Sequence, residues 1–474
     1  MRKRWLGVVS LLLAFALVAA ACGDDDDAAE TTAAPTTTQA ATTTEAPSTT
    51  QAETTTTAAP TTTAAEPSVA FDTGVTPAPC PEAVNEGNGC IFLGVISDLT
   101  DGPFAAVAVP LTQAQEDYWA AVNAAGGIDG WDVIISADNT FDARYDPGLT
   151  VEGFESMADS VVAMAQSLGT PQTQAAIPRF IEESVVAAPA TWWSGWSFDE
   201  VDSGLILESG ASYCFEAMNG VFFAQDKLGP EISYAIVAFP GDYGGDYGAG
   251  VKIAAAQLGL GDPVAEILQV PFSVGGTPDE AVATLAAAAP DVIFMVTGPT
   301  EMATITAGLF GVLGPAFKVI GAAPTWNVGL LANPDLVPLL QAVYYQTSPW
   351  GGWNADTGAH ANMRAAAEAN ERTPNNGYIA GWIFQYPLIS LLTAAIADGD
   401  LTRANLASLV SDITVDYDGA LPDRTYGAAN DTVERSTTVN GVDPASPDGL
   451  TALSDTFVAE ITAGFDLAGP CFTG

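Results

Sequence analysis

The stretch that decides the fold begins with an apolar run, Ile91-Phe92-Leu93-Gly94-Val95-Ile96-Ser97, and continues through the loop Asp98-Leu99-Thr100-Asp101-Gly102-Pro103-Phe104. A short continuous apolar run that is bounded by turn residues is typical of a strand buried on both faces. Over residues 111–125 the pattern changes to the period of an amphipathic helix, and a second apolar run follows at 132–139. A strand, a helix and a strand in this order predict a βαβ unit with parallel strands.

The same alternation continues along the chain in two series. In the first, strands are expected at 91–97, 132–139, 160–166 and 184–190, with helices at 111–125, 151–158 and 173–183. In the second, strands are expected at 233–239, 264–270, 291–297 and 318–323, with helices at 248–258, 278–289 and 301–313. The predicted fold class is therefore α/β, with two doubly wound lobes built on mainly parallel sheets.

The N-terminus has the pattern of a secretory signal. Residues 1–4 are basic, and residues 5–21 form an apolar stretch that is shorter than a membrane-spanning helix requires. Small residues directly precede Cys22, which resembles a bacterial lipobox. We predict a signal peptide at 1–21 and lipidation of Cys22, which would anchor the protein to the outer side of the cell membrane. Ordinary cleavage that leaves Cys22 unmodified is the alternative.

Residues 22–68 are predicted to be a tether. An acidic run at 24–27 is followed by a segment made almost wholly of Thr, Ala, Pro, Gln and Glu. Such a segment has too little apolar bulk to offset its chain entropy, and its composition suits an extended spacer. The part beyond it is longer than one hydrophobic core usually serves, so two lobes are expected.

Charge excludes one class of partner. The chain has 57 acidic and 13 basic residues and a net charge of −44, which argues against nucleic acid or an anionic lipid surface. We interpret the acidic surface as favouring solubility in a saline habitat.

Four cysteines remain after Cys22, and an even set in an exported chain favours two disulfides. Three connectivities are possible, and we favour Cys80–Cys90 together with Cys214–Cys471. Metal binding is not expected, because no Cys-x-x-Cys pair exists and His360 is the single histidine. His360 lies in a capped helix start and is expected to be solvated.

The loops that follow the predicted strands are rich in hydroxyls, glycines and aromatic side chains. Ligands collect at the carboxyl ends of the strands in such sheets, so this composition indicates binding. The sequence has no Gly-x-Ser-x-Gly elbow and no glycine-rich phosphate motif between a strand and a helix. Neither an enzyme nor a cofactor is therefore expected. Asp242 and Asp246 do not by themselves indicate a glycosidase.

Several phrases resemble the type I periplasmic binding proteins of the leucine/isoleucine/valine-binding family. They are Gly102-Pro103-Phe104, the run Val122-Asn123-Ala124-Ala125-Gly126-Gly127-Ile128-Asp129-Gly130, the loop at 138–142, Tyr247-Gly248-Ala249-Gly250 and Asp291-Val292-Ile293-Phe294. The resemblance implies a small-molecule ligand that is closed between two lobes, and association with the permease subunits of an ABC transporter. It also implies crossings near 205–210, near 346–350 and past 417. The first lobe would comprise 69–207 and 350–420, and the second 208–349 and 421–474.

The resemblance also implies ligand-binding residues. Gly169 and Thr170 would hold a ligand carboxylate at a helix N-terminus. The remaining candidates would form walls around it: Phe104, Thr191, Trp192, Tyr243, Tyr247, Thr297 and Trp326. We assign Trp350 and Trp353 to hinge packing, and Trp196 is as compatible with the core as with the site.

One position departs from the family pattern. Where amino-acid binders place an acidic residue for the ammonium group, this chain has Ala322-Ala323-Pro324. We therefore predict an extracytoplasmic substrate-binding lipoprotein of an ABC transporter that takes a small amino-acid-like or carboxylate ligand, with an amine-free acid preferred over leucine or valine. Asp242 or Asp246 could still supply the countercharge. A sensor that uses the same clamp without transport is the alternative.

Overall fold

The apolar run quoted above is strand β3 (Gly89–Ser97) in the computed structural model, which describes residues 69–427 and 433–474. β3 pairs in parallel with β4 (Trp131–Asp142) and with β5 (Ala163–Leu168), and β5 pairs in parallel with β6 (Ala187–Ala190). The short β2 (Val75–Thr76) pairs with β3 in the antiparallel sense. Every residue of β5 is buried, as expected for a strand covered on both faces.

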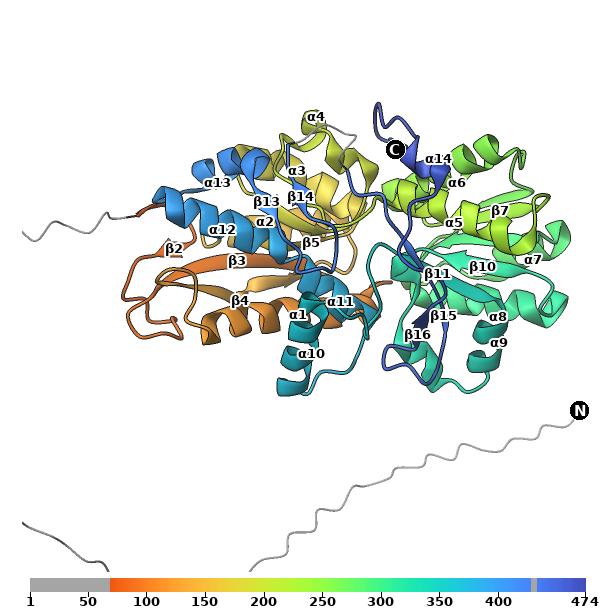
Figure 1. Cartoon of the computed structure of the whole chain (residues 1–474), viewed down its shortest axis with the longest axis horizontal. Coiled ribbons are helices and arrows are strands. Elements are labelled where there is room, and N and C mark those ends of the chain that lie inside the picture. Colours follow the sequence, from red (N-terminus) through yellow and green to blue (C-terminus); the bar gives the residue numbers. More distant parts are fainter. Residues whose placement is uncertain (1–68, 428–432) are drawn as a thin grey trace, which may run out of the picture. The chain divides into compact units, whose positions relative to one another are not determined.

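The helices between these strands are α1 (Ala105–Ala124), α2 (Pro147–Met157) and α3 (Thr170–Glu183). Figure 1 shows that helices from the C-terminal half of the chain also cover this sheet. They are α10 (Gly358–Ala369), α11 (Asn376–Ile383), α12 (Tyr386–Asp398) and α13 (Arg403–Leu409).

Helices α1 and α11 pack closely through glycines. A Cβ atom on Gly377 or Gly381 would lie 2.1 Å from a backbone carbonyl oxygen of α1, so no larger residue fits there. The stretch Asn376–Asp398 is long and apolar enough to cross a membrane by composition, but it is mostly buried within this lobe.

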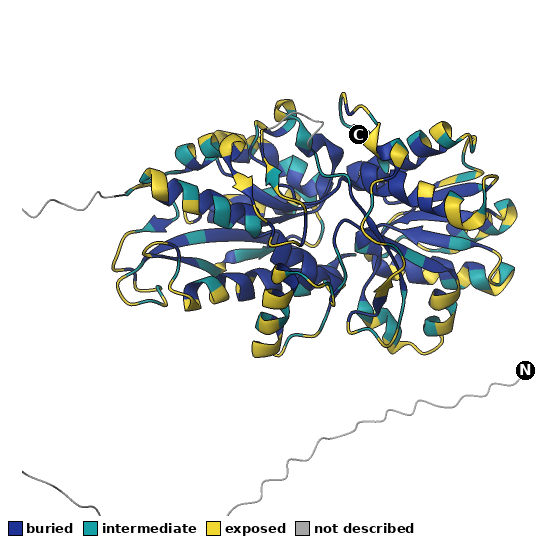
Figure 2. Ribbon diagram, viewed as in Figure 1, coloured by how far each residue is buried: buried dark blue, intermediate teal, exposed yellow. Residues whose placement is uncertain are grey.

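The second sheet has seven strands in the order β16-β15-β11-β10-β9-β7-β8. Five are parallel: β7 (Tyr234–Ala238), β8 (Ala265–Leu268), β9 (Val292–Val296), β10 (Lys318–Gly321) and β11 (Tyr344–Ser348). The other two, β15 (Thr438–Val442) and β16 (Leu450–Ala452), extend it as antiparallel strands. The inner strands of both sheets, such as β5, β7 and β9, are buried throughout (Figure 2). The predicted fold class is confirmed.

The helices of the second sheet are α5 (Tyr213–Leu228), α6 (Asp242–Leu258), α7 (Asp279–Ala288), α8 (Pro299–Leu313) and α9 (Leu336–Val343). The shorter elements are β1 (Ala70–Phe71), η1 (Ser194–Ser197), α4 (Asp199–Asp202), η2 (Phe272–Val274), η3 (Ala323–Thr325), η4 (Val328–Ala332), β12 (Asp400–Leu401), η5 (Val410–Asp412), β13 (Thr414–Val415), β14 (Arg424–Thr425) and α14 (Glu460–Ala463).

The chain passes between the lobes after β6, after β11 and after β14. Both favoured disulfides, Cys80–Cys90 and Cys214–Cys471, are present, and the second joins the C-terminal segment to α5 across a separation of 257 residues. The predicted signal peptide (1–21), the lipidated Cys22 and the tether (22–68) lie outside the described residues.

Helix α1 begins at Ala105, six residues earlier than the expected start at 111. Pro110 lies inside the helix, where proline is normally excluded because it lacks an N–H group. The carbonyl of Ala106 would otherwise accept that hydrogen bond, and here it accepts one from the Asn327 side chain at 2.5 Å. The helix therefore tolerates Pro110 by bonding to the other lobe.

Candidate functional site

A cavity of about 40 Å³ lies where the two lobes meet. Each water in a buried site needs roughly 10–15 Å³ on this measure, so the cavity, called the slot below, is small. The first lobe contributes most of the lining: Phe104, Val107, Ala108, Leu111, Tyr145, Leu168, Gly169, Thr170, Ala190, Trp192, Asn376 and Ala380. The second lobe contributes Tyr213, Tyr243, Ala323 and Pro324, and the crossing after β11 contributes Trp350.

The N-terminus of α3 forms one wall of this slot. Gly169 has a φ of 91°, and a Cβ atom there would lie 2.7 Å from Cε2 of Tyr145, so glycine is required. The buried Thr170 hydroxyl forms a short hydrogen bond with the Thr191 hydroxyl. A helix N-terminus next to hydroxyl groups can hold a carboxylate, as expected for Gly169 and Thr170.

Three buried tyrosines also line the slot, Tyr145 from the first lobe and Tyr213 and Tyr243 from the second. Burial raises the pKa of the Tyr145, Tyr213 and Tyr243 hydroxyls well above their ordinary value, so all three stay protonated at physiological pH. The rings of Tyr213 and Tyr243 pack edge to face with 4.8 Å between their centroids, and the Tyr145 ring packs edge to face on Phe104. The Tyr243 hydroxyl donates to the Thr297 carbonyl at 3.1 Å.

Phe104 is held in the slot by the loop after β3. The Asp98 carboxylate accepts the backbone N–H of Phe104 at 2.8 Å and that of Gly102 at 3.0 Å. Burial raises the pKa of Asp98 to about 6, although these two hydrogen bonds act in the opposite direction. Asp98 therefore shapes the loop and positions an aromatic ring.

Two tryptophans, Trp192 and Trp350, also line the slot. Trp192 donates its indole N–H to the Ser209 carbonyl at 2.7 Å, and its ring lies 5.2 Å from that of Trp350. Trp350, which the sequence suggested for hinge packing, is thus both beside the hinge and in the slot.

A family model described as "periplasmic binding protein" matches residues 91–446, which is most of the chain. This chain belongs to the periplasmic binding protein family. The members are extracytoplasmic ligand-binding proteins that work with ABC transporters, a family of binders rather than enzymes, and their ligands vary. No curated protein sequence matches this binding protein.

Solved structures agree with this fold. A fatty acid ABC transporter substrate-binding protein from Thermomonospora curvata is 25% identical, with a TM-score of 0.72, and the match covers 84% of this chain and 97% of that one. A branched-chain amino acid ABC transporter protein from Thermus thermophilus with bound valine is 15% identical, with a TM-score of 0.65 and coverage of 79% and 98%. A solute binding protein from Rhodopseudomonas palustris HaA2 in complex with p-hydroxybenzoic acid is also 15% identical, with a TM-score of 0.63 and coverage of 78% and 97%.

Five of the nine candidate ligand residues line the slot of this binding protein: Phe104, Gly169, Thr170, Trp192 and Tyr243. Thr191 lies directly behind Thr170, to which it is bonded. Thr297 lies behind Tyr243, whose hydroxyl bonds to its carbonyl.

Two candidates lie in the core instead. Trp326 is fully buried, donates its indole N–H to the Asp448 carbonyl at 3.0 Å and stacks on Tyr344. Tyr247 is fully buried within α6. In both cases packing inside the second lobe directs the ring away from the slot.

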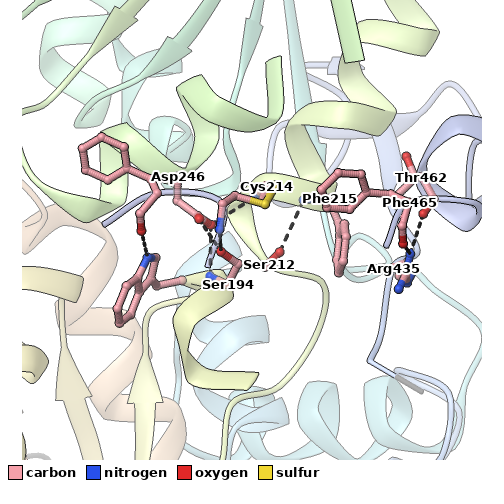
Figure 3. Close-up of a disulfide and its surroundings, with 11 residues drawn as sticks. Ser194, Ser212, Cys214, Phe215, Asp246, Arg435, Thr462 and Phe465 are labelled. Carbon is pink, nitrogen blue, oxygen red and sulfur yellow. Dashed lines mark hydrogen bonds between the residues drawn. A yellow bond between two sulfur atoms is a disulfide. The ribbon is translucent and has the colours of Figure 1, made fainter. Parts of the chain in front are cut away.

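No lining residue among those described carries a charged side chain. The Asp246 carboxylate instead accepts hydrogen bonds from the N–H and the hydroxyl of Ser194 and from the N–H of Cys214, the last at 3.1 Å (Figure 3). Asp242 accepts the N–H of Gly474 at 2.9 Å. Both carboxyls thus serve the junction with the C-terminal segment and do not face the slot.

Glu216 is the buried carboxyl next to the slot wall. Its Oε1 accepts the backbone N–H of Ala323 at 2.7 Å and the Thr347 hydroxyl at 2.6 Å. Burial raises its pKa to about 8, so the group is mostly neutral at pH 7. Glu216 does not line the slot, and its Oε2 has no hydrogen-bond partner among the described residues.

The lobes are in direct contact across the slot. Asn327 of the second lobe donates to Ala106 at 2.5 Å, and Asn376 of α11 donates to Ala323 at 3.2 Å. These bonds cross from one lobe to the other, and they describe a closed form of this binding protein.

His360 is buried and not solvated as expected. It follows Thr357, which caps α10, and its ring nitrogens contact the Thr357 hydroxyl at 2.7 Å and the Gly351 carbonyl at 3.2 Å. Burial lowers its pKa. In the described part of the chain, the clustered metal-type ligands are Cys80, Glu82 and Cys90, and their two cysteines are joined in a disulfide.

Sequence reasoning missed Tyr145, Tyr213, Trp350 and Asn376 as lining residues. Tyr145 carried no local signal, although it and Arg144 have positive φ values of 60° and 49°. Such backbone strain in residues other than glycine gathers at functional sites, but it is visible only in a structure.

Proposed function

We propose that this protein is the extracytoplasmic substrate-binding lipoprotein of an ABC transporter, and that its ligand is a carboxylic acid with an apolar body and no amine. The observation that carries the proposal is the composition of the slot. It has a helix N-terminus at Gly169 and Thr170 with the Thr170 hydroxyl, apolar and aromatic walls, and no acidic side chain.

An amino acid would bring an ammonium group into this slot. A buried charge is tolerated only when it is paired or fully hydrogen-bonded, and an unpaired one is unfavourable by several kcal/mol. Asp242 and Asp246 are bonded away from the slot, and Glu216 lies behind Ala323, whose N–H its Oε1 accepts, and does not line the slot. An acid without an amine avoids that penalty.

The apolar walls indicate what the rest of the ligand is like. Val107, Ala108 and Leu111 lie on one face of α1, and Leu168 and Ala380 complete an apolar surface beside them. The fatty acid substrate-binding protein from Thermomonospora curvata, at 25% identity, supports an acid of this class.

The proposal includes the envelope assignment. The signal peptide at 1–21 would direct export and be removed. The lipidated Cys22 and the tether at 22–68 would then hold the binding lobes outside the membrane, near the permease subunits. The lobes, taken as 69–207 with 350–420 and 208–349 with 421–474, would close on the ligand by hinge motion. They follow the two sheets except at β14, which pairs with β13 of the first lobe.

Isothermal titration of the purified protein tests the ligand class. The probes are octanoate, benzoate, 4-methylpentanoate, leucine and valine, and we expect binding of at least one acid and weak or no binding of the two amino acids. Submicromolar binding of leucine would contradict the proposal. Mass spectrometry of any copurifying small molecule is an independent readout.

A sensor with the same clamp is the second candidate function. Genes for permease and ATPase subunits beside this gene would favour transport, whereas a neighbouring signalling gene would favour sensing.

A further inference from the structure

Trp350 has a buried donor that no described residue satisfies. It lines the slot and is 2% exposed, yet its indole N–H has no hydrogen-bond acceptor. The neighbouring Trp192 does have one, the carbonyl of Ser209. A buried N–H that has lost water without gaining an acceptor is destabilising, and such groups are rare. We infer that Trp350 donates its indole N–H to an oxygen atom of the bound ligand.

The indole ring is fixed independently of a ligand. Its backbone is tied to Ser348, whose hydroxyl donates to the Trp350 carbonyl at 3.0 Å. Its ring packs 5.2 Å from Trp192 and 5.7 Å from Phe384, measured between centroids. A donor that is already held in place binds a ligand without losing further side-chain freedom.

Trp350 belongs to a series of aromatic rings in contact with one another along the slot. Ring contacts connect Trp350 through Trp192, Tyr213 and Tyr243 to Phe104, so aromatic rings link Trp350 to the loop after β3. The inference rests on the proposed function, since an acid supplies acceptor oxygens. The acceptor is either the carboxylate itself or a second oxygen further along the ligand, and both are hydrogen-bond acceptors of the same kind.

Trp350→Phe tests the inference, because phenylalanine keeps a ring and removes the N–H. Trp196→Phe is the matched control. Trp196 is also buried with an unpartnered indole N–H, but it belongs to η1 and does not line the slot. Dissociation constants of wild type and both variants are measured by titration with octanoate, benzoate, 4-hydroxybenzoate and leucine, and thermal midpoints are measured without ligand.

We expect Trp350→Phe to weaken binding of the acid by about tenfold, as for loss of a hydrogen bond to a charged group. Trp196→Phe should leave that affinity unchanged. Without ligand, both variants should have lower thermal midpoints than wild type, because the smaller ring leaves space in a packed site. The comparison of acid affinity between the two variants therefore separates a ligand contact from a packing role.

The outcomes separate the two proposals. Equal losses for benzoate and 4-hydroxybenzoate identify the carboxylate as the acceptor, and a loss confined to 4-hydroxybenzoate identifies the second oxygen; either result supports the inference. Unchanged acid affinity in Trp350→Phe, or an equal loss in Trp196→Phe, overturns it and leaves the proposed function standing. If wild type binds leucine alone and Trp350→Phe weakens that binding, the proposed function fails and the inference holds. Absence of binding for every probe overturns both.

Discussion

Replacing Ala323 by aspartate should move the ligand preference from an acid towards the matching amino acid. Ala323 lines the slot, is 1% exposed and occupies the position where the chain lacks the family's acidic residue. Its backbone N–H is held by Glu216, and the substitution leaves that hydrogen bond in place. Leucine and 4-methylpentanoate are the informative pair, because they differ only by the amine.

The magnitude follows from the burial of this position. At an effective dielectric constant of about 20, opposite charges 4 Å apart attract by about 4 kcal/mol. The new carboxylate would also repel the ligand carboxylate, but both ligands carry that group, so the repulsion cancels in the ratio of their dissociation constants. A conservative half of the attraction is about 2 kcal/mol, which corresponds to a change of about 30-fold in that ratio.

Titration of both ligands against wild type, Ala323→Asp and Ala323→Asn measures this ratio. Asparagine has the size of aspartate without its charge, so any shift that it shares with aspartate is steric. Thermal midpoints establish that each variant is folded. A ratio that stays within about threefold of wild type in Ala323→Asp, in a folded protein, would refute the electrostatic reasoning.

Three further predictions concern stability and the anchor. Burial raises the pKa values of four carboxyls, to about 6 for Asp98, 8 for Asp202, 8 for Glu216 and 7 for Asp246. Between about pH 4 and pH 8 the folded state therefore binds more protons than the unfolded state, so stability decreases as pH rises, and the thermal midpoint should be higher at pH 5 than at pH 8. Cys471→Ser opens a loop of 257 residues and should lower the free energy of unfolding by about 5 kcal/mol. Cys80→Ser opens a loop of ten residues and should lower it by about 3 kcal/mol. Denaturant unfolding measures both losses, and a larger loss for Cys80→Ser would contradict this prediction. Cys22→Ala should release the protein into the medium or leave an unprocessed precursor, as fractionation would show, and unchanged membrane retention would sink the lipoprotein assignment.

The strands could be predicted because their signal is local. β9 is five apolar residues in a row, and all five are buried. The C-terminal strands β15 and β16 were not expected. β15 has the sequence Thr-Val-Asn-Gly-Val, which is not apolar throughout, and it is a strand because it pairs with β11 about ninety residues earlier in the chain. Long-range antiparallel pairing of this kind leaves little trace in a short stretch of sequence.

Part of the site could be predicted for the same reason. Gly169, Thr170 and Trp192 follow strands whose carboxyl ends meet at one edge of a sheet, and all three line the slot. Trp326 also follows a strand, yet its ring turns into the core and stacks on Tyr344. The direction of a side chain beyond a strand end is set by the tertiary packing around it, and sequence position alone does not specify that packing.

Pro110 shows how one residue can mislead at the local level and still serve the whole fold. A proline in a helical pattern usually indicates a helix boundary, and the sequence predicted a helix only from 111. In the structure the helix passes through Pro110, and the Ala106 carbonyl that this residue cannot satisfy bonds to Asn327 of the other lobe. In a regular helix the Ala106 carbonyl would bond to the N–H of residue 110, and because proline lacks that N–H the carbonyl is available to Asn327. Because this bond forms only when the lobes meet, the proline that interrupts the helical ladder contributes to the closed form in which the slot is complete.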